Sequence, residues 1–163
     1  MKALVVYFSK FGNTQKVAEA IAEMLESAGS VCVLSLEQLT ASDMKGVDLV
    51  VMGSPTHRMN LPEAVRLVLK GFPRRILRGT HIATFDTSYK MSWWLSHFTA
   101  ARRLARALRR LGGRQIAPPE TFHVMEKEGP LYEGEIERAR KWAEFLSGKL
   151  QRQPESAPPK FST

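Results

Sequence analysis

The sequence predicts an α/β protein in which helices cover both faces of a parallel β-sheet. Short apolar runs rich in β-branched residues recur along the 163 residues without polar alternation, as in strands buried on both faces. Segments with apolar residues three and four positions apart, typical of amphipathic helices, alternate with these runs. Strands that alternate with helices in this way are joined by right-handed crossovers, so they are expected to form one sheet between two helix layers.

The chain opens with a predicted strand and a predicted helix. Residues 3–8, ALVVYF, are apolar, and most are β-branched or aromatic. Residues 13–29 form the helix, which a glycine, Gly29, is expected to end. Its apolar face is formed by Val17, Ile21, Met24, Leu25 and Ala28.

Two strands and a second helix are predicted in the middle of the chain. Residues 31–36, VCVLSL, form one strand, and residues 47–55 form another that Gly-Ser-Pro stops. Residues 61–72 read as a helix with Pro62 in its first turn. Cys32 lies among valines and is expected to be a buried, inert thiol.

The last part of the chain repeats the alternation. Residues 80–86 form a fourth strand, and residues 96–113 form a helix closed by two glycines. Residues 114–124 carry an interrupted fifth strand, and residues 131–150 form a last helix.

These elements indicate one domain over residues 1–150, followed by a tail. The tail, residues 151–163, is rich in Pro and Ser with few apolar residues and is expected to be disordered. No apolar stretch reaches the ~18 residues that span a membrane, and we read no signal peptide. The single cysteine excludes an internal disulfide and fits a reducing compartment, so we expect a cytoplasmic protein with no membrane partner.

Positive charge is concentrated in one part of the sequence. The formal net charge is +8, yet residues 66–114 contain twelve Lys or Arg and a single acid, Asp86, for a local balance of +11. The rest of the chain carries a balance of −3. This region could attract an acidic partner by long-range electrostatics.

Ligands of such folds bind beyond the carboxyl ends of the strands, so the loops that follow the strands are the candidate sites. The first is SKFGNT, residues 9–14, just before a predicted helix. Its hydroxyls, its side-chain amide and the free amides of the helix N-terminus suit a phosphate group, and Gly12 allows close backbone approach. A simple N-capped turn at Asn13 or Thr14 is the alternative.

Two further loops could complete a site for a flat ligand. After the third strand, backbone amides could bond a heterocycle and His57 or Met59 could pack against a ring, although His57 and Arg58 taken alone are better interpreted as surface residues. After the fourth strand, Tyr89, Trp93 and Trp94 could stack on a planar ligand. Alternatively, one or both tryptophans pack beneath the next helix. Asp86 and Thr87 could bond a ligand edge or cap the turn.

Three segments, in this order, resemble flavodoxins. They are VVYFSKFGNTQKVAEAIA at residues 5–22, VDLVVMGSPTHRMNLPEAV at 47–65 and ATFDTSYKM at 83–91. The resemblance covers roughly residues 1–150 and implies a three-layer sandwich with five parallel strands in the order 2-1-3-4-5, the flavodoxin-like fold.

The resemblance also implies non-covalent binding of flavin mononucleotide (FMN) and electron transfer with a redox partner protein. The FMN phosphate would be held without a metal by Ser9, Lys10, Phe11, Gly12, Asn13 and Thr14. The ring would lie between the second and third loops. The residues implied there are Ser54, Pro55, Thr56, His57, Arg58, Met59, Asp86, Thr87, Tyr89 and Trp93.

Two features depart from the pattern of the family. Phe11 stands where many flavodoxins have a hydroxyl residue, and the chain is basic where electron-carrier flavodoxins are usually acidic. The basic charge argues either against the docking mode of those carriers or for an acidic partner. Two alternatives stay open. One is an FMN-dependent NAD(P)H:quinone-type oxidoreductase, and the other is a flavin-free interaction module with the same fold.

Other chemistries lack a sequence signal. The four histidines form no close-spaced pair with one another or with the cysteine, so no metal ligands are predicted. Ser9 lies in no nucleophile elbow, so no catalytic residue is predicted. The arginines of residues 96–113 lie opposite an apolar face, and we interpret them as a solvated helix face rather than a nucleic-acid contact.

Overall fold

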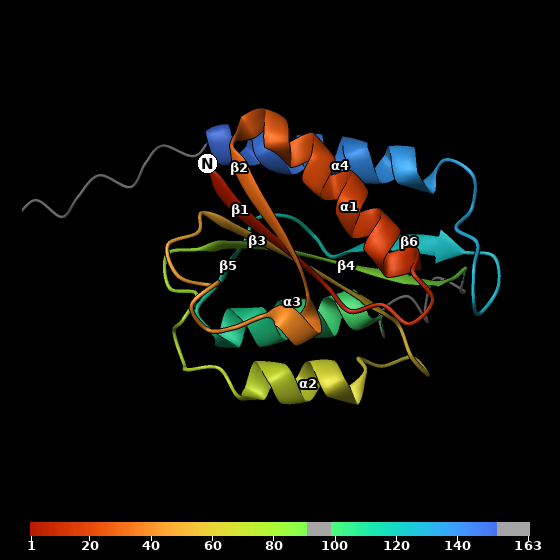
Figure 1. Cartoon of the computed structure of the whole chain (residues 1–163), viewed down its shortest axis with the longest axis horizontal. Helices are drawn as coiled ribbons and strands as arrows, with labels where there is room; N and C mark the ends of the chain where they lie inside the picture. Colours follow the sequence, from red (N-terminus) through yellow and green to blue (C-terminus); the bar gives the residue numbers. More distant parts are fainter. Residues whose placement is uncertain (91–98, 153–163) are drawn as a thin grey trace, which may run out of the picture.

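The computed structural model describes residues 1–90 and 99–152 and consists of a central parallel sheet between two pairs of helices (Figure 1). The strand order is β2-β1-β3-β4-β5, and β6 also pairs with β4. All the pairings between these strands are parallel. The strands are β1 (Lys2–Tyr7), β2 (Ser30–Ser35), β3 (Leu49–Pro55), β4 (His81–Tyr89), β5 (Arg114–Gln115) and β6 (Glu120–Val124). The predicted fold class and strand order are confirmed.

The interrupted fifth strand is confirmed as two short pieces. β5 pairs with the start of β4, where Arg114 lies opposite His81, and β6 pairs with its end, where Glu120 lies opposite Phe85. Pro118 and Pro119 lie between them. Proline has no amide hydrogen to donate to a neighbouring strand, so the pairing breaks there and resumes one residue later.

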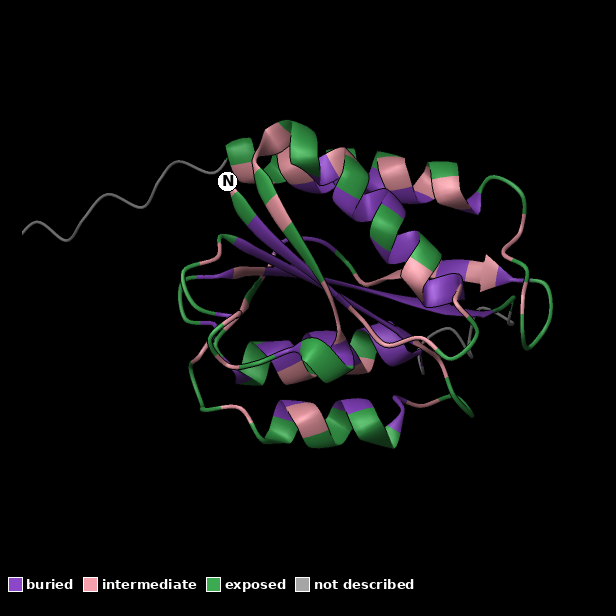
Figure 2. Ribbon diagram, in the orientation of Figure 1, coloured by how far each residue is buried: buried purple, intermediate pink, exposed green. Residues whose placement is uncertain are grey.

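Helices α1 (Asn13–Leu25) and α4 (Glu135–Gln151) lie over one face of the sheet. Helices α2 (Glu63–Lys70) and α3 (Ala100–Arg110) lie over the other (Figure 1). Successive residues of β1 supply the two cores, since Val5 packs under α1 and α4 while Val6 packs on the side of α2 and α3. The central strands are therefore buried on both faces, as their unbroken apolar runs predict (Figure 2).

Element ends differ slightly from the predicted ones. A 3₁₀ turn, η1 (Glu26–Ala28), follows α1 before Gly29, and Pro62 immediately precedes α2 rather than lying inside it. The chain between β2 and β3 contains a short 3₁₀ turn, η2 (Leu36–Gln38), and no α-helix. α4 extends to Gln151, while the predicted tail lies, from residue 153 onward, outside the described residues. None of the described helices is long and apolar enough to cross a membrane.

The expectation of a buried Cys32 is wrong. Cys32 is exposed on β2, which is the edge strand of the sheet. Because no α-helix connects β2 to β3, this edge lacks the helix cover that buries the inner strands. The apolar run alone does not distinguish an edge strand from a central one.

Candidate functional site

A pocket of about 200 Å³ lies at the carboxyl ends of β1, β3 and β4. The three loops predicted from the sequence meet there, since each follows one of these strands. The pocket is lined by Ser9, Lys10, Phe11, Asn13, Thr14, Pro55, Thr56, His57, Thr87, Ser88, Tyr89, Val124 and Lys127. Ten of these residues are among those that the sequence predicts.

The first loop turns sharply into the N-terminus of α1. Gly12 precedes the helix with φ of 89°, a left-handed conformation that glycine adopts without steric cost. The Ser9 hydroxyl oxygen accepts a hydrogen bond from the Gly12 amide at 3.0 Å, which leaves its own hydrogen free to donate. The amides of the first helical turn have no partner within the helix, so they and the helix dipole favour an anion at this point.

Hydrogen bonds join the loops to one another. The hydroxyl oxygens of Thr14 and Thr87 lie 2.8 Å apart, which links the first loop to the third. The Thr56 amide donates to the Thr87 carbonyl at 3.0 Å, which links the second loop to the third. The pocket therefore has a wall of connected segments rather than three independent loops.

The second loop is a tight hairpin. His57 and Asn60 exchange backbone hydrogen bonds of 2.9 and 2.8 Å, and the two residues between them, Arg58 and Met59, have φ of 47° and 59°. Non-glycine residues rarely adopt this left-handed conformation, and a pair of them is the geometry of a type I′ turn. The hairpin presents His57 to the pocket, while Arg58 and Met59 at its tip do not line it.

The pocket is electropositive. The Lys10 ammonium lies 3.1 Å from Nδ1 of His57, and an ammonium can only donate, so Nδ1 accepts. The charge of Lys10, with smaller effects of partial burial, Arg58 and Lys127, holds the pKa of His57 below its ordinary value. His57 is therefore neutral at pH 7, and Lys10 and Lys127, which also line the pocket, supply the positive charge.

Asp86 caps a helix and does not line the pocket. It is fully buried, and its Oδ2 accepts hydrogen bonds from the Ala101 amide at 2.8 Å and from the Thr56 hydroxyl at 3.1 Å. Burial raises the pKa of the Asp86 carboxyl, and these hydrogen bonds partly oppose that effect. Asp86 therefore caps the start of α3, which is a different place from the turn directly after β4 that the sequence suggested.

The remaining predicted residues are distributed as follows. Ser54 is buried with its hydroxyl donating to the Pro55 carbonyl, and Gly12 contributes backbone only; neither lines the pocket. Phe11 and Tyr89 line the pocket and are about half exposed. Trp93 lies outside the described residues.

Sequence reasoning missed a fourth contributor, the segment that follows β6. Val124 and Lys127 line the pocket, and the Glu128 carbonyl accepts a hydrogen bond from the Asn13 side chain at 3.1 Å. This segment could have been predicted from the sequence by the same rule as the other three loops, because it also follows the carboxyl end of a parallel strand. Ser88, between two predicted residues, was missed as well.

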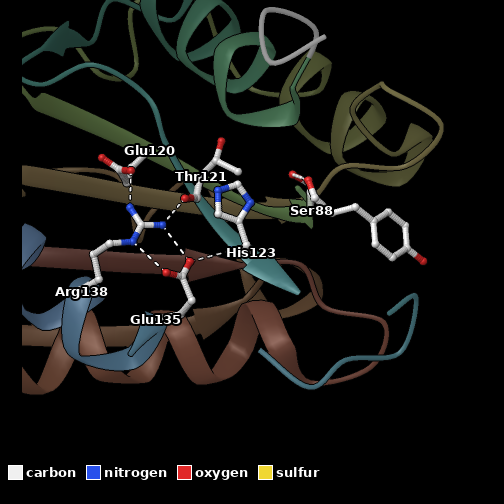
Figure 3. A network of polar contacts seen from close by, with 7 residues as sticks. Ser88, Glu120, Thr121, His123, Glu135 and Arg138 are labelled. Atoms are coloured by element: carbon white, nitrogen blue, oxygen red, sulfur yellow. Dashed lines mark hydrogen bonds and ion pairs between the residues drawn. The ribbon is translucent and has the colours of Figure 1, made fainter. Parts of the chain in front are cut away.

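A partly exposed ion network anchors the fourth segment (Figure 3). Arg138 of α4 binds Glu120 at 2.5 Å, Glu135 at 2.8 Å and the Thr121 carbonyl, and its guanidinium lies 4.5 Å from the centre of the Phe122 ring. Glu135 also accepts a hydrogen bond from the His123 amide at 2.6 Å. Burial alone would raise the pKa of Glu135, but the bonds from Arg138 and His123 hold it below its ordinary value. β6 and the start of α4, which flank the segment, are thereby fixed to each other.

Comparisons with known proteins agree with this geometry. Residues 4–93, more than half of the chain, match the family model described as "Flavodoxin domain". The chain is 34% identical over 127 residues to "NADPH-dependent diflavin oxidoreductase 1" of Emericella nidulans, which covers 71% of this chain and 18% of that protein. It spans about a fifth of the length of the diflavin relatives that it matches.

Matches of similar length are flavodoxins. A "Flavodoxin" of Clostridium saccharobutylicum is 23% identical over 93% of this chain and 98% of its own length. The crystal structure of oxidised Flavodoxin 2 from Bacillus cereus superposes with a TM-score of 0.74 at 21% identity, over 91% of this chain and 99% of that one, which establishes the shared fold. The chain therefore belongs to the flavodoxin family, and membership of that family implies a flavin cofactor.

Proposed function

We propose that this protein binds FMN non-covalently and exchanges electrons with a separate redox partner. The observation that carries the proposal is the convergence, in one pocket, of the helix N-terminus, two hydroxyls and two lysines. Ser9 and Thr14 would donate to phosphate oxygens, and Lys10 and Lys127 would neutralise the phosphate charge. These donors match a phosphate monoester, so the residues present fit the group.

The other side of the pocket suits a planar ring. His57 from the second loop and Tyr89 from the third line it, and both offer a flat face. When bound, a flavin accepts and releases electrons one or two at a time, and the protein supplies binding, orientation and electrostatics. Because His57 is neutral, the positive charge that favours an anionic phosphate would come from Lys10 and Lys127.

The partner that we propose carries an acidic surface. The net charge of +8 and the balance of +11 within residues 66–114 would repel a basic partner and accelerate encounter with an acidic one. This inverts the charge relation of acidic flavodoxins and basic partners.

Titration of FMN with the apo protein tests the proposal. We expect saturable quenching of flavin fluorescence, with riboflavin, which lacks the phosphate, binding at least about tenfold more weakly because charge-assisted hydrogen bonds are lost. Absence of saturable quenching would contradict FMN binding and would leave the flavin-free module as the better description.

A reduction assay separates the electron carrier from the oxidoreductase. We expect NADPH alone to bleach the bound flavin slowly, and dithionite, a chemical reductant that needs no docking surface, to bleach it rapidly. Rapid bleaching by NADPH alone would instead favour the NAD(P)H:quinone-type enzyme.

A further inference from the structure

A groove of about 810 Å³ lies between α2 and α3. These two helices cover the face of the sheet opposite α1 and α4 (Figure 1). It is larger than the flavin pocket, and none of the predicted cofactor-binding residues lines it. Its composition has two parts, a basic rim and an apolar floor.

The rim carries six cations and no acid. They are Arg66, Lys70, Arg74, Arg103, Arg106 and Arg110. Within residues 1–90 and 99–152, none of the six forms an ion pair, and Nε of Arg103 is buried without a hydrogen-bond partner. On the opposite face, by contrast, Arg138 and Arg140 of α4 pair with glutamates. No acid among the described residues therefore neutralises the charge of the groove by an ion pair.

The neighbouring acids do not neutralise the groove. Glu63 lies on α2 but does not line it, α3 contains no acid, and Asp86 is buried beneath the start of α3. Six like charges so close together repel one another, and a bound anionic surface would relieve that repulsion.

The floor is aliphatic and aromatic. It is formed by Leu61, Leu69, Phe72, Ala107 and Leu111. A nucleic-acid backbone would use the cations but would leave this floor without an apolar partner. An amphipathic peptide with acidic side chains on its flanks and apolar side chains at its centre complements both parts.

The groove also adjoins the flavin pocket. Asn60 and Leu61 line one end of it, and Asn60 pairs with His57, which lines the pocket. A segment lying in the groove would thus come beside the hairpin that separates the two sites. We propose, resting on the function proposed above, that the α2–α3 groove docks an acidic amphipathic segment of the redox partner.

A synthetic peptide tests this without knowledge of the partner. The probe is a fluorescein-labelled 20-residue amphipathic helix with glutamates flanking a leucine face, and binding to the full-length chain is followed by fluorescence anisotropy. The groove variant Arg106→Glu with Arg110→Glu is compared with Arg109→Glu with Arg114→Glu, whose residues are exposed but do not line the groove. Both variants change the net charge by −4, so general electrostatic attraction falls equally.

We expect the groove variant to bind the peptide at least about tenfold more weakly and the control variant to lose less than about threefold. Equal losses in both variants would overturn the proposal, as would undiminished binding of a peptide with all glutamates replaced by glutamine. Tighter, groove-dependent binding of a 20-nucleotide single-stranded DNA would overturn it in favour of nucleic acid. FMN titration of the natural protein keeps the two proposals separate, because absence of FMN binding together with groove-dependent peptide binding refutes the cofactor and not the groove.

Discussion

The hydroxyl oxygens of Thr14 and Thr87 lie 2.8 Å apart in the buried interior of the pocket wall. Thr14 belongs to the first turn of α1 and Thr87 to the end of β4, so one hydrogen bond joins the proposed phosphate loop to the loop that would border the flavin ring. A hydroxyl carries one hydrogen and two lone pairs. Thr14 can donate to a phosphate only if Thr87 donates to Thr14, so the two contacts depend on each other.

Replacing Thr14 by valine is expected to weaken FMN binding by about tenfold or more, because a hydrogen bond to a charged group contributes roughly 1.5–3 kcal/mol. Fluorescence titration measures the change, and riboflavin affinity should remain nearly constant because the phosphate is the group affected. Thr14→Ser should retain FMN affinity. Gln15→Ala is the neighbouring control, since Gln15 bonds Glu19 and does not line the pocket. Equal losses for FMN and riboflavin would place the effect on folding rather than on the phosphate.

His57 should report on the bound phosphate through its own titration. Its pKa lies below the ordinary value, chiefly because of Lys10, so the neutral ring dominates at neutral pH. A phosphate placed beside Lys10 opposes that charge and should raise the pKa of His57, which NMR of the ring resonances can follow with and without FMN. Lys10→Met should raise it in the free protein. An unchanged His57 pKa on saturation with FMN would contradict a phosphate in the first loop.

The lowered pKa of His57 also makes the stability of the fold depend on pH, and the direction of that dependence follows from the direction of the pKa shift. Because the folded-state pKa of His57 is below the unfolded one, the unfolded chain binds more protons between those two values. The contribution of His57 is therefore fully present above about pH 6.5 and is lost as the pH falls towards the folded-state pKa.

The fold was predictable because buried parallel strands leave a strong sequence signal. Val5 and Val6 are adjacent and both apolar, and the structure needs both, since they enter different cores on the two faces of the sheet. The apolar run around Cys32 led to the wrong prediction that this residue is buried, because an apolar run does not reveal which strand lies at the edge of the sheet.

The details of the site depend on contacts that no local pattern encodes. Asp86 suits a ligand as well as a cap, and the choice is made by where the Ala101 amide lies in space. Lys127 reaches the pocket only because the chain resumes pairing with β4 after the two prolines and because Asn13 holds the Glu128 carbonyl. A tight hairpin with non-glycine residues at its tip, Arg58 and Met59, likewise has no turn signature in the sequence.

Asp86 provides a test of the capping role. Asp86→Ala should cost roughly 1–3 kcal/mol of unfolding free energy, because it leaves the buried Ala101 amide and the Thr56 hydroxyl without their acceptor. Asp86→Asn keeps an acceptor of the same shape and should cost less. Chemical denaturation measures both. A loss of FMN affinity in Asp86→Asn with unchanged stability would instead place Asp86 in the cofactor site.

The difference in stability between the natural protein and Asp86→Asn should also depend on pH, in a direction that the pKa of Asp86 sets. Burial raises the pKa of Asp86 in the folded state above the ordinary 3.8, so the folded chain binds the extra proton between 3.8 and the raised value. The stability of the natural protein relative to Asp86→Asn should therefore rise as the pH falls through that window. A difference that is independent of pH would contradict the burial effect.

Two glycine substitutions should change stability in opposite directions. A Cβ on Gly53 of β3 would lie 2.0 Å from the Phe85 ring, which is buried and packed edge-to-face against Phe122 and Trp142, so it has no room to move away. Gly53→Ala is expected to destabilise the fold by roughly 1–3 kcal/mol or more through overpacking. Gly148 lies in α4, where a Cβ would contact only the end of the flexible Arg152 side chain at 3.4 Å. Gly148→Ala should therefore stabilise the protein by about 0.5–1 kcal/mol through helix propensity. Thermal and urea unfolding measure the change in stability of each variant. A Gly53→Ala variant as stable as the natural protein would show that the Phe85 ring does not pack against Gly53 of β3.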